Sequence, residues 1–196
     1  MFYNLTADDR FGYSVAGLGD LDSDGVGDLA TGAFLDDDGG ASNGAVYVVF
    51  LATDGSAKNA QKLSILHGNL GTFYTLGNGD LSGYSVEVLG DISGDGVTDL
   101  AGGAVYDDDG NANAGAVYIL FLDTSGIVNG AKKLSIQYGN FGTFYSLIAD
   151  DRFGSSIAAL GDVDGDGIID FGLLVTKPIS PLGGGAQNTL RRCPAD

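Results

Sequence analysis

The chain has 196 residues, and its 26 acidic against 9 basic side chains give a formal net charge of -17. Such a charge repels phosphate backbones and anionic lipid surfaces, so no nucleic acid or membrane-surface partner is expected. No apolar run approaches the about 18 residues of a membrane-spanning helix, so no direct membrane insertion is expected either. The single cysteine, Cys193, excludes an intrachain disulfide framework, and the single histidine, His67, argues against a histidine-based catalytic site. Because Glu87 is the only glutamate, the acids are nearly all aspartate, the residue of tight turns and calcium loops.

In chain order, the first signals are those of short strands. Four segments are rich in valine, leucine and aromatic residues and are bounded by glycine and aspartate clusters, namely residues 13–18, 28–33, 44–51 and 61–66. No stretch of about ten residues shows a 3.6-residue apolar period free of glycine, so we expect little helix. The 44% of hydrophobic residues is enough for a packed core.

The four predicted strands recur along the chain at a constant spacing. The acidic segments start at residues 20, 91 and 162, each 71 residues apart. Segments that repeat at this spacing are 20–28 with 91–99 and 162–170, 44–47 with 115–118, and 71–74 with 142–145. Four-stranded units in tandem are typical of propeller blades, which bury their faces against one another. We therefore predict an all-β fold, a partial β-propeller of four-stranded antiparallel blades.

The repeats are predicted to cover residues 1–175 as about two and a half blades. Met1 falls where the other copies have Thr72 and Thr143, so the chain is expected to begin within a repeat. Propellers close with about 4–8 blades, so we expect further blades of the same chain, or other copies, to complete the ring. Residues 176–196 hold all three prolines and depart from the repeat. We predict a disordered, basic, proline-containing tail there, with a truncation or frame-shift product and a linker to another module as alternatives.

Each repeat contains an acidic loop of the pattern Asp-x-Asp-x-Asp-Gly-x-x-Asp, with one substitution in the second copy. Carboxylates at positions 1, 3 and 5 converge on one hard cation, the glycine permits a sharp turn, the carbonyl at position 7 adds a ligand, and the acid at position 9 closes the shell. Calcium tolerates this flexible all-oxygen geometry better than magnesium, whereas zinc and copper prefer nitrogen or sulfur. We therefore predict up to three Ca²⁺ ions. The expected ligands are Asp20, Asp22, Asp24, Val26 and Asp28; Asp91, Ser93, Asp95, Val97 and Asp99; and Asp162, Asp164, Asp166, Ile168 and Asp170.

The three acidic loops are called loop 1 (20–28), loop 2 (91–99) and loop 3 (162–170). Loop 2 is expected to bind more weakly, because Ser93 replaces one of its acids. The alternative for each loop is a solvated aspartate turn without metal. An EF-hand is disfavoured because it needs flanking helices and a glutamate at position 12, where this chain has Thr31, Gly102 and Leu173.

Two further acidic turns consist of three consecutive aspartates, at residues 36–38 and 107–109. Their spacing lacks the alternation that aims side chains at one ion. We predict solvated hairpin loops, with a ligand site on the propeller rim as the alternative. His67 aligns with Tyr138 at the repeat spacing, so we expect a packing or surface role for it and no catalytic one.

Several short motifs recur beside loop 1, namely Phe11-Gly12, Phe153-Gly154, Gly32-Ala33-Phe34 and Gly103-Ala104. Together with loop 1 they resemble FG-GAP repeats, the blades of the integrin alpha-subunit propeller and its bacterial relatives. The phenylalanine is expected in the core, and the glycine is expected to allow a close backbone approach. Ser82 replaces this phenylalanine in the second repeat, and Phe34 and Val105 replace the family's proline. These departures favour a divergent array of the microbial type.

The resemblance implies a calcium-binding propeller segment at the cell surface or outside the cell, one that serves adhesion or binds a protein or glycan ligand. It also places each acidic loop between the first two strands of a blade. No enzymatic activity is expected in this chain, although acid–base chemistry by Asp108 or Asp151 is a remaining alternative. The other readings are an accessory, calcium-stabilised scaffold region of a larger secreted hydrolase or lyase, and a purely structural spacer.

Overall fold

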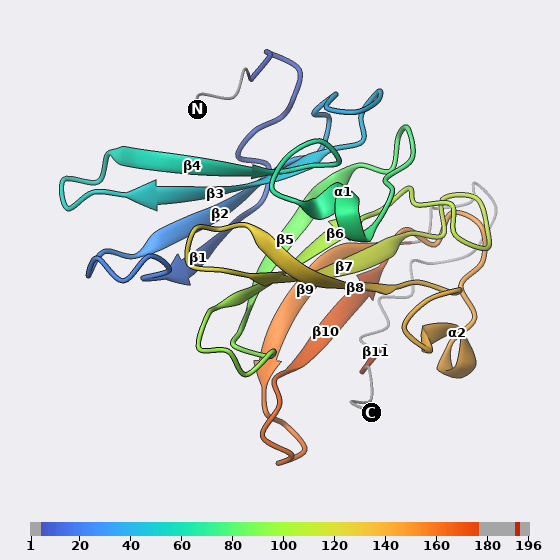
Figure 1. The fold of residues 1–196 in the computed structure, drawn as a ribbon. Helices are drawn as coiled ribbons and strands as arrows, with labels where there is room; N and C mark the ends of the chain where they lie inside the picture. Colours follow the sequence, from blue (N-terminus) through green and yellow to red (C-terminus); the bar gives the residue numbers. More distant parts are fainter. Residues whose placement is uncertain (1–4, 177–190, 193–196) are drawn as a thin grey trace.

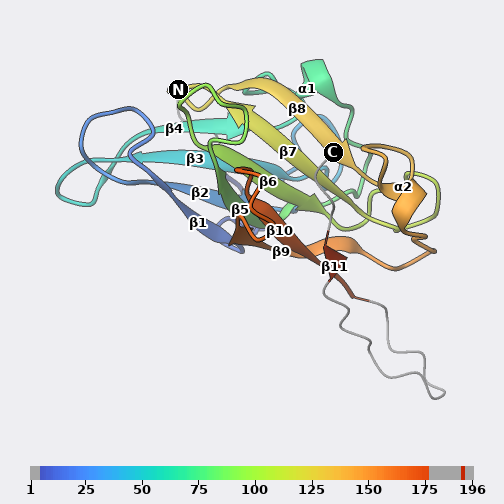
Figure 2. The same cartoon turned by 90° about the horizontal axis from the view of Figure 1, so that it is seen from below.

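The computed structural model describes residues 5–176 and 191–192, whose strands form three antiparallel sheets that follow one another in chain order (Figures 1 and 2). Blade 1 has the order β1-β2-β3-β4, with β1 (Val15–Gly19), β2 (Asp28–Ala33), β3 (Ala45–Leu51) and β4 (Ala57–Leu63). Blade 2 repeats this order with β5 (Ser82–Gly90), β6 (Asp99–Ala104), β7 (Ala116–Leu122) and β8 (Val128–Leu134). Blade 3 has the order β11-β10-β9, with β9 (Phe153–Gly161), β10 (Asp170–Val175) and β11 (Arg191–Arg192). The predicted all-β fold of four-stranded antiparallel blades is confirmed.

The fourth strand of blade 1 begins earlier than the sequence pattern predicts. It covers residues 57–63 in place of 61–66, and its first three residues are exposed. Ser64 and His67 instead close a turn through two backbone hydrogen bonds of 3.1 and 3.3 Å. An outer strand with a solvated edge is polar, so apolar periodicity does not reveal its start. The expected low helix content is confirmed for the described residues, where helices are limited to the single turns α1 (Leu70–Phe73) and α2 (Phe141–Phe144).

Neighbouring blades approach each other most closely at glycines. A Cβ atom on Gly103 would lie 2.0 Å from the carbonyl oxygen of Gly154, and one on Gly32 would lie 1.9 Å from that of Gly83. Gly83 and Gly154 also have φ angles of +82° and +85°, in the left-handed region that favours glycine. The predicted close backbone approach is therefore confirmed at Gly83 and Gly154, whereas it is wrong for Gly12, where an added Cβ would meet nothing within 4 Å.

Apolar side chains fill the two spaces between successive blades. Val48 of blade 1 packs in one cluster with Leu120 of blade 2, whereas Ile119, which follows the period-two alternation of β7, points to the other side and packs with Phe153 of blade 3. Phe153 is 1% exposed, so its predicted core position is correct. The same prediction is wrong for Phe11, which is 46% exposed because no described blade lies on the outer side of β1.

A buried lysine lies against each turn of three aspartates. Lys62 Nζ is 2.8 Å from Asp36 Oδ1 and 2.6 Å from Asp38 Oδ2. Tyr47 donates a 2.9 Å hydrogen bond to Asp36 Oδ2. The equivalent residues of blade 2 repeat this arrangement, namely Lys133, Asp107, Asp109 and Tyr118. The predicted solvated loop is therefore wrong for the first aspartate of each turn, because β4 and β8 bring a lysine against it that the local sequence does not show.

Blade 3 is paired unequally on the two edges of its second strand. β10 pairs along β9 from Asp170 to Val175, but β11 pairs only with Gly172 and Leu173. The rest of the predicted tail, residues 177–190 and 193–196, lies outside the described residues, so its disorder stays a prediction.

Candidate metal centre

Each acidic loop connects the first two strands of its blade, with its ninth residue beginning the second strand. Asp28, Asp99 and Asp170 are the first residues of β2, β6 and β10. The flanking elements are strands in all three cases, which agrees with the arrangement that the resemblance implies and excludes the EF-hand alternative.

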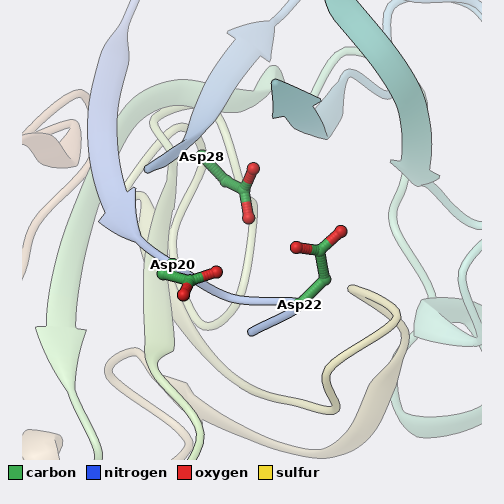
Figure 3. A group of neighbouring side chains, drawn as sticks. All are labelled: Asp20, Asp22 and Asp28. Carbon is green, nitrogen blue, oxygen red and sulfur yellow. The ribbon is translucent and has the colours of Figure 1, made fainter. Parts of the chain in front are cut away.

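Three carboxylates converge in loop 1. One oxygen each of Asp20, Asp22 and Asp28 lies within 4.8 Å of the other two, and the side chains point toward a common centre (Figure 3). Asp28 is buried, and its two oxygens accept hydrogen bonds of 3.0 Å from the backbone N–H groups of Leu21 and Leu51. These bonds fix the Asp28 carboxylate at the base of the site, where β2 begins, whereas Asp20 and Asp22 lie in the part of loop 1 that precedes β2.

Asp24, the fifth position of loop 1, does not join this group. Its Oδ1 accepts a 2.8 Å hydrogen bond from the N–H of Val26, and its Oδ2 contacts the Nζ of Lys58 from β4. The hydrogen bond from Lys58 holds the pKa of Asp24 below its usual value. Asp20 in turn accepts hydrogen bonds of 2.9 Å from the N–H groups of Asp24 and Gly25. The loop backbone is therefore wound around the Asp20 carboxylate.

The group of three carboxylates in loop 1 also contains an oxygen without a hydrogen-bond donor. Asp22 Oδ1 is buried and has no hydrogen-bond donor within reach, while Oδ2 of the same side chain lies 2.7 Å from Lys58 Nζ. A buried carboxylate oxygen without a donor is costly, and a bound cation removes that cost. This oxygen, together with an all-carboxylate donor set, fits a hard divalent cation such as calcium.

Loop 3 repeats the converging group and loop 2 does not. Asp162, Asp164 and Asp170 bring their oxygens within 4.8 Å of one another. In loop 2, Ser93 stands at the third position and its hydroxyl lies 3.4 Å from Asp91 Oδ1. No group of three carboxylates is found in loop 2 among the residues that the structure describes. The replacement of an acid by Ser93 thus leaves loop 2 without the group of three carboxylates that loops 1 and 3 contain.

Hydrogen bonds lower the pKa of one aspartate of loop 2, and burial raises the pKa of another. The N–H of Gly96 leads a set of backbone donors that hold the pKa of Asp91 below its usual value. Burial raises the pKa of Asp99, and backbone hydrogen bonds, first from the N–H of Leu122, oppose that rise. A cation at this loop would therefore meet one readily ionised carboxylate and one whose charge is costly without it.

The fifth and seventh positions are coupled in the same way in all three loops. The backbone N–H groups of Val26, Val97 and Ile168 donate to the fifth-position carboxylates at 2.7–2.9 Å, and the acceptors are Asp24, Asp95 and Asp166. Asp95 and Asp166 are exposed. Convergence was predicted for positions 1, 3 and 5, with the acid at position 9 closing the shell; in loops 1 and 3 the carboxylates that come together are those at positions 1, 3 and 9, and the fifth lies outside the group. The role predicted for the carbonyl at position 7 stays a prediction.

The fold and these loops define the class of protein. Residues 82–120, which span β5 to β7 with loop 2, match the family model named FG-GAP repeat. Blades 1 and 3 carry the same loop at the 71-residue spacing on either side of this match. The chain is an FG-GAP repeat protein, and its sheets are blades of a partial propeller.

The chain is also similar to integrin alpha subunits of animals. It is 33% identical over 158 residues to Integrin alpha-7 of Homo sapiens, which covers 80% of this chain and 11% of that protein. It is 32% identical over 175 residues to Integrin alpha-5 of Xenopus laevis, covering 86% of this chain and 15% of that protein. Integrin alpha pat-2 of Caenorhabditis elegans is 35% identical over 99 residues, covering 48% of this chain and 7% of that protein. The chain thus spans a small part of these relatives, and the expected microbial type of array stays a prediction.

Sequence reasoning missed Lys58 as a member of the loop 1 site. Lys58 lies at the start of β4, 34 residues beyond Asp24, and no local pattern links the two. The 71-residue spacing gives Asn129 at the matching position of blade 2, so the repeat itself gives no signal either. Among the described residues, no helix is long and apolar enough to cross a membrane.

Proposed function

We propose that this chain is a calcium-binding segment of an extracellular or cell-surface propeller that binds a protein or glycan ligand and serves adhesion. Up to three Ca²⁺ ions would be held by loops 1 to 3, with the strongest sites in loops 1 and 3. The ions would neutralise the crowded carboxylates and lock the turns between the first two strands of each blade. The ligand-binding surface would be formed by loops carried on this rigid scaffold.

The observation that carries the calcium proposal is the unpaired Asp22 Oδ1 within the converging group of loop 1. Three carboxylates whose oxygens lie within 4.8 Å of one another repel without a cation. Calcium outside cells is abundant enough for loops that bind only in the range of about 10⁻⁴–10⁻³ M. The similarity to integrin alpha subunits supports the extracellular and adhesive part of the proposal.

Calorimetric titration with Ca²⁺, followed by thermal melts in Ca²⁺ and in EDTA, tests the metal sites. We expect a melting temperature that is higher in Ca²⁺, because the ion binds the folded state. Asp28→Asn and Asp170→Asn should each remove a binding event, since each removes the buried acid of one site. Asp8→Asn, an equal change in charge at an exposed residue outside the loops, is the matched control and should change nothing. Identical melts in Ca²⁺ and EDTA would argue against structural calcium.

Capture of extracellular matrix proteins and glycans on arrays, with Ca²⁺ or EDTA, tests the ligand-binding part. Binding that requires Ca²⁺ and is reduced by Asp170→Asn supports an adhesive segment. The alternative is a calcium-stabilised scaffold region of a larger secreted hydrolase or lyase. That reading is favoured if calcium stabilises the chain but no array component binds.

A further inference from the structure

Two tyrosines meet across the contact between blades 1 and 2. Tyr13 lies just before β1 of blade 1, and Tyr84 lies in β5 of blade 2. They are 71 positions apart, so they occupy the same place in successive repeats. The hydroxyl of Tyr13 donates a 3.1 Å hydrogen bond to that of Tyr84, and the centres of the two rings are 5.0 Å apart. The two blades thus bring a pair of phenol groups into direct contact.

Packing and a backbone contact hold this pair in place. The ring of Phe34, which follows β2, has its centre 4.5 Å from that of Tyr13 and 5.3 Å from that of Tyr84. The residues next to the two tyrosines are also joined, since Ser14 Oγ donates a 3.0 Å hydrogen bond to the carbonyl of Gly83. The contact between the blades therefore fixes the spacing of the two phenols.

A second contact between tyrosines is built differently. The rings of Tyr74 and Tyr118 have their centres 5.4 Å apart and meet edge to face, at 73°. The hydroxyl of Tyr74 accepts a 2.9 Å hydrogen bond from the N–H of Lys133, and that of Tyr118 donates to Asp107 at 2.8 Å. Of these two pairs, only Tyr13 and Tyr84 combine a contact between rings with a contact between hydroxyl groups.

The composition makes tyrosine the main target of a one-electron oxidant. The sequence has nine tyrosines but no tryptophan, one methionine and one cysteine. Tyr13 is 53% exposed among the described residues, so an oxidant reaches its ring. The hydrogen bond with Tyr13 raises the pKa of Tyr84 above its usual value, so Tyr84 is a neutral phenol at neutral pH. Removing an electron from a phenol makes its hydroxyl proton acidic, and a hydrogen-bonded neighbour gives that proton an acceptor.

We propose that Tyr13 and Tyr84 form a dityrosine cross-link when the protein meets hydrogen peroxide and a haem peroxidase. Each phenol loses one electron and one proton, and the two phenoxyl radicals join through the ring carbons next to their hydroxyl groups. The hydrogens on those carbons then move to the oxygens as protons, which restores both aromatic rings. One peroxide is reduced to two waters, so the chain loses two hydrogen atoms in all.

The observed contact is close to the geometry of the product. In a biphenol of this kind the two hydroxyl groups flank the new carbon–carbon bond and stay within hydrogen-bond distance of each other, as they do here. The bond would join blade 1 to blade 2 across 71 positions of the chain. A cross-link that closes so long a loop stabilises chiefly by restricting the unfolded chain. Ser155 stands at this position in the third repeat, so the link is confined to blades 1 and 2.

Treatment of the dilute full chain with hydrogen peroxide and a haem peroxidase tests the proposal, with free tyrosine as the check that the oxidant is active. We expect a monomer lighter by two hydrogen atoms, dityrosine fluorescence, and a proteolytic fragment that joins the peptides of Tyr13 and Tyr84. Tyr13→Phe and Tyr84→Phe should each remove this fragment, because phenylalanine keeps the ring but forms no phenoxyl radical. Tyr138→Phe removes an exposed phenol elsewhere and is the matched control, which should leave the fragment unchanged.

Melting curves and an unfolded control complete the test. The oxidised parent should melt about 5–15 °C above the oxidised Tyr13→Phe variant, since only the parent carries the link. Oxidation in concentrated urea should lower the yield of the joined fragment at least about fivefold, because unfolding separates the two rings. The proposal is overturned if the folded chain gives no joined fragment, or if either phenylalanine variant still gives it. It is also overturned if the unfolded chain gives as much, or if only dimers of the chain contain dityrosine.

Discussion

Lys62 Nζ lies 2.8 Å from Asp36 Oδ1, and both side chains are almost completely buried, at 3% and 2% exposure. Tyr47 completes the contact from β3, where its hydroxyl binds the second Asp36 oxygen and its ring lies beneath the ammonium group, 5.5 Å from Nζ. Burial raises the pKa of Tyr47 above its usual value, and the hydrogen bond to Asp36 and the charge of Asp36 raise it further. The pair ties the turn after the inner strand β2 to the outer strand β4 of the same blade.

Lys62→Met should destabilise the protein strongly. It leaves the buried carboxylate of Asp36 without its counter-charge, and breaking a buried pair from one side costs about 3–5 kcal/mol. The double variant Lys62→Met with Asp36→Asn should recover part of this loss, since no charge is then left unpaired. Urea unfolding measures both, with Lys132→Met, an exposed lysine on β8, as the matched control. A double variant less stable than Lys62→Met would contradict this account.

Asp80 should make stability fall as the pH rises through weakly acidic values. Burial raises the pKa of its carboxyl to about 6, although the N–H of Gly77 donates to it at 2.7 Å. The folded state therefore binds more protons than the unfolded state between about pH 4 and 6, and the free energy of unfolding contributed by Asp80 decreases as pH rises across that window.

Asp80→Asn removes this titration while keeping an oxygen that accepts from Gly77. We expect the variant to exceed the parent in stability by roughly 1–2 kcal/mol at pH 7 and to match it near pH 3.5. Urea unfolding from pH 3.5 to 7.5 measures the difference, and Asp8→Asn is the exposed control. Parallel profiles for parent and variant would show that Asp80 titrates normally.

Gly103→Ala should separate blades 2 and 3. Its Cβ would lie 2.0 Å from the carbonyl oxygen of Gly154 and 2.5 Å from Ser85 Oγ, which itself donates to that carbonyl at 2.7 Å. The new methyl group therefore forces the backbones apart, and we expect a loss of more than about 2 kcal/mol in urea unfolding. Gly102→Ala is the adjacent control, since its Cβ would meet only Val46 Cγ2 at 3.6 Å. Equal effects of the two changes would mean that the blade contact is looser than the structure has it.

These glycines also show which features of the protein were predictable from sequence. A close backbone approach permits only glycine, so the sequence itself shows the requirement at Gly32 and again 71 residues later at Gly103. The loops and most strands are equally local, because their patterns occupy fewer than about ten residues. The Lys62 pair was not predictable, since Lys62 and Asp36 are 26 positions apart and each alone looks like a surface residue. Lys58 was not predictable for the same reason, because its contact with loop 1 forms only once β4 pairs with β3.

Lys58→Met should have effects of opposite sign in the absence and presence of calcium. Lys58 Nζ contacts Asp22 and Asp24, and these contacts supply a positive charge to loop 1. In EDTA the variant should be slightly less stable, since the two carboxylates lose their partner. A Ca²⁺ ion drawn to the same carboxylates competes with that charge, so removing the lysine should strengthen calcium binding at loop 1 by about threefold to fivefold.

Calorimetric titration of parent and variant, with melts in EDTA and in saturating Ca²⁺, measures both effects. Lys132→Met again removes one charge at an exposed position and should leave loop 1 unchanged. The background of Asp170→Asn isolates loop 1 from loop 3, because that change removes the buried acid of the third site. Weaker calcium binding in Lys58→Met would mean that the lysine organises the loop for the ion. Stronger binding would mean that it holds the carboxylates together until the ion replaces it, which is the behaviour that the unpaired Asp22 Oδ1 predicts.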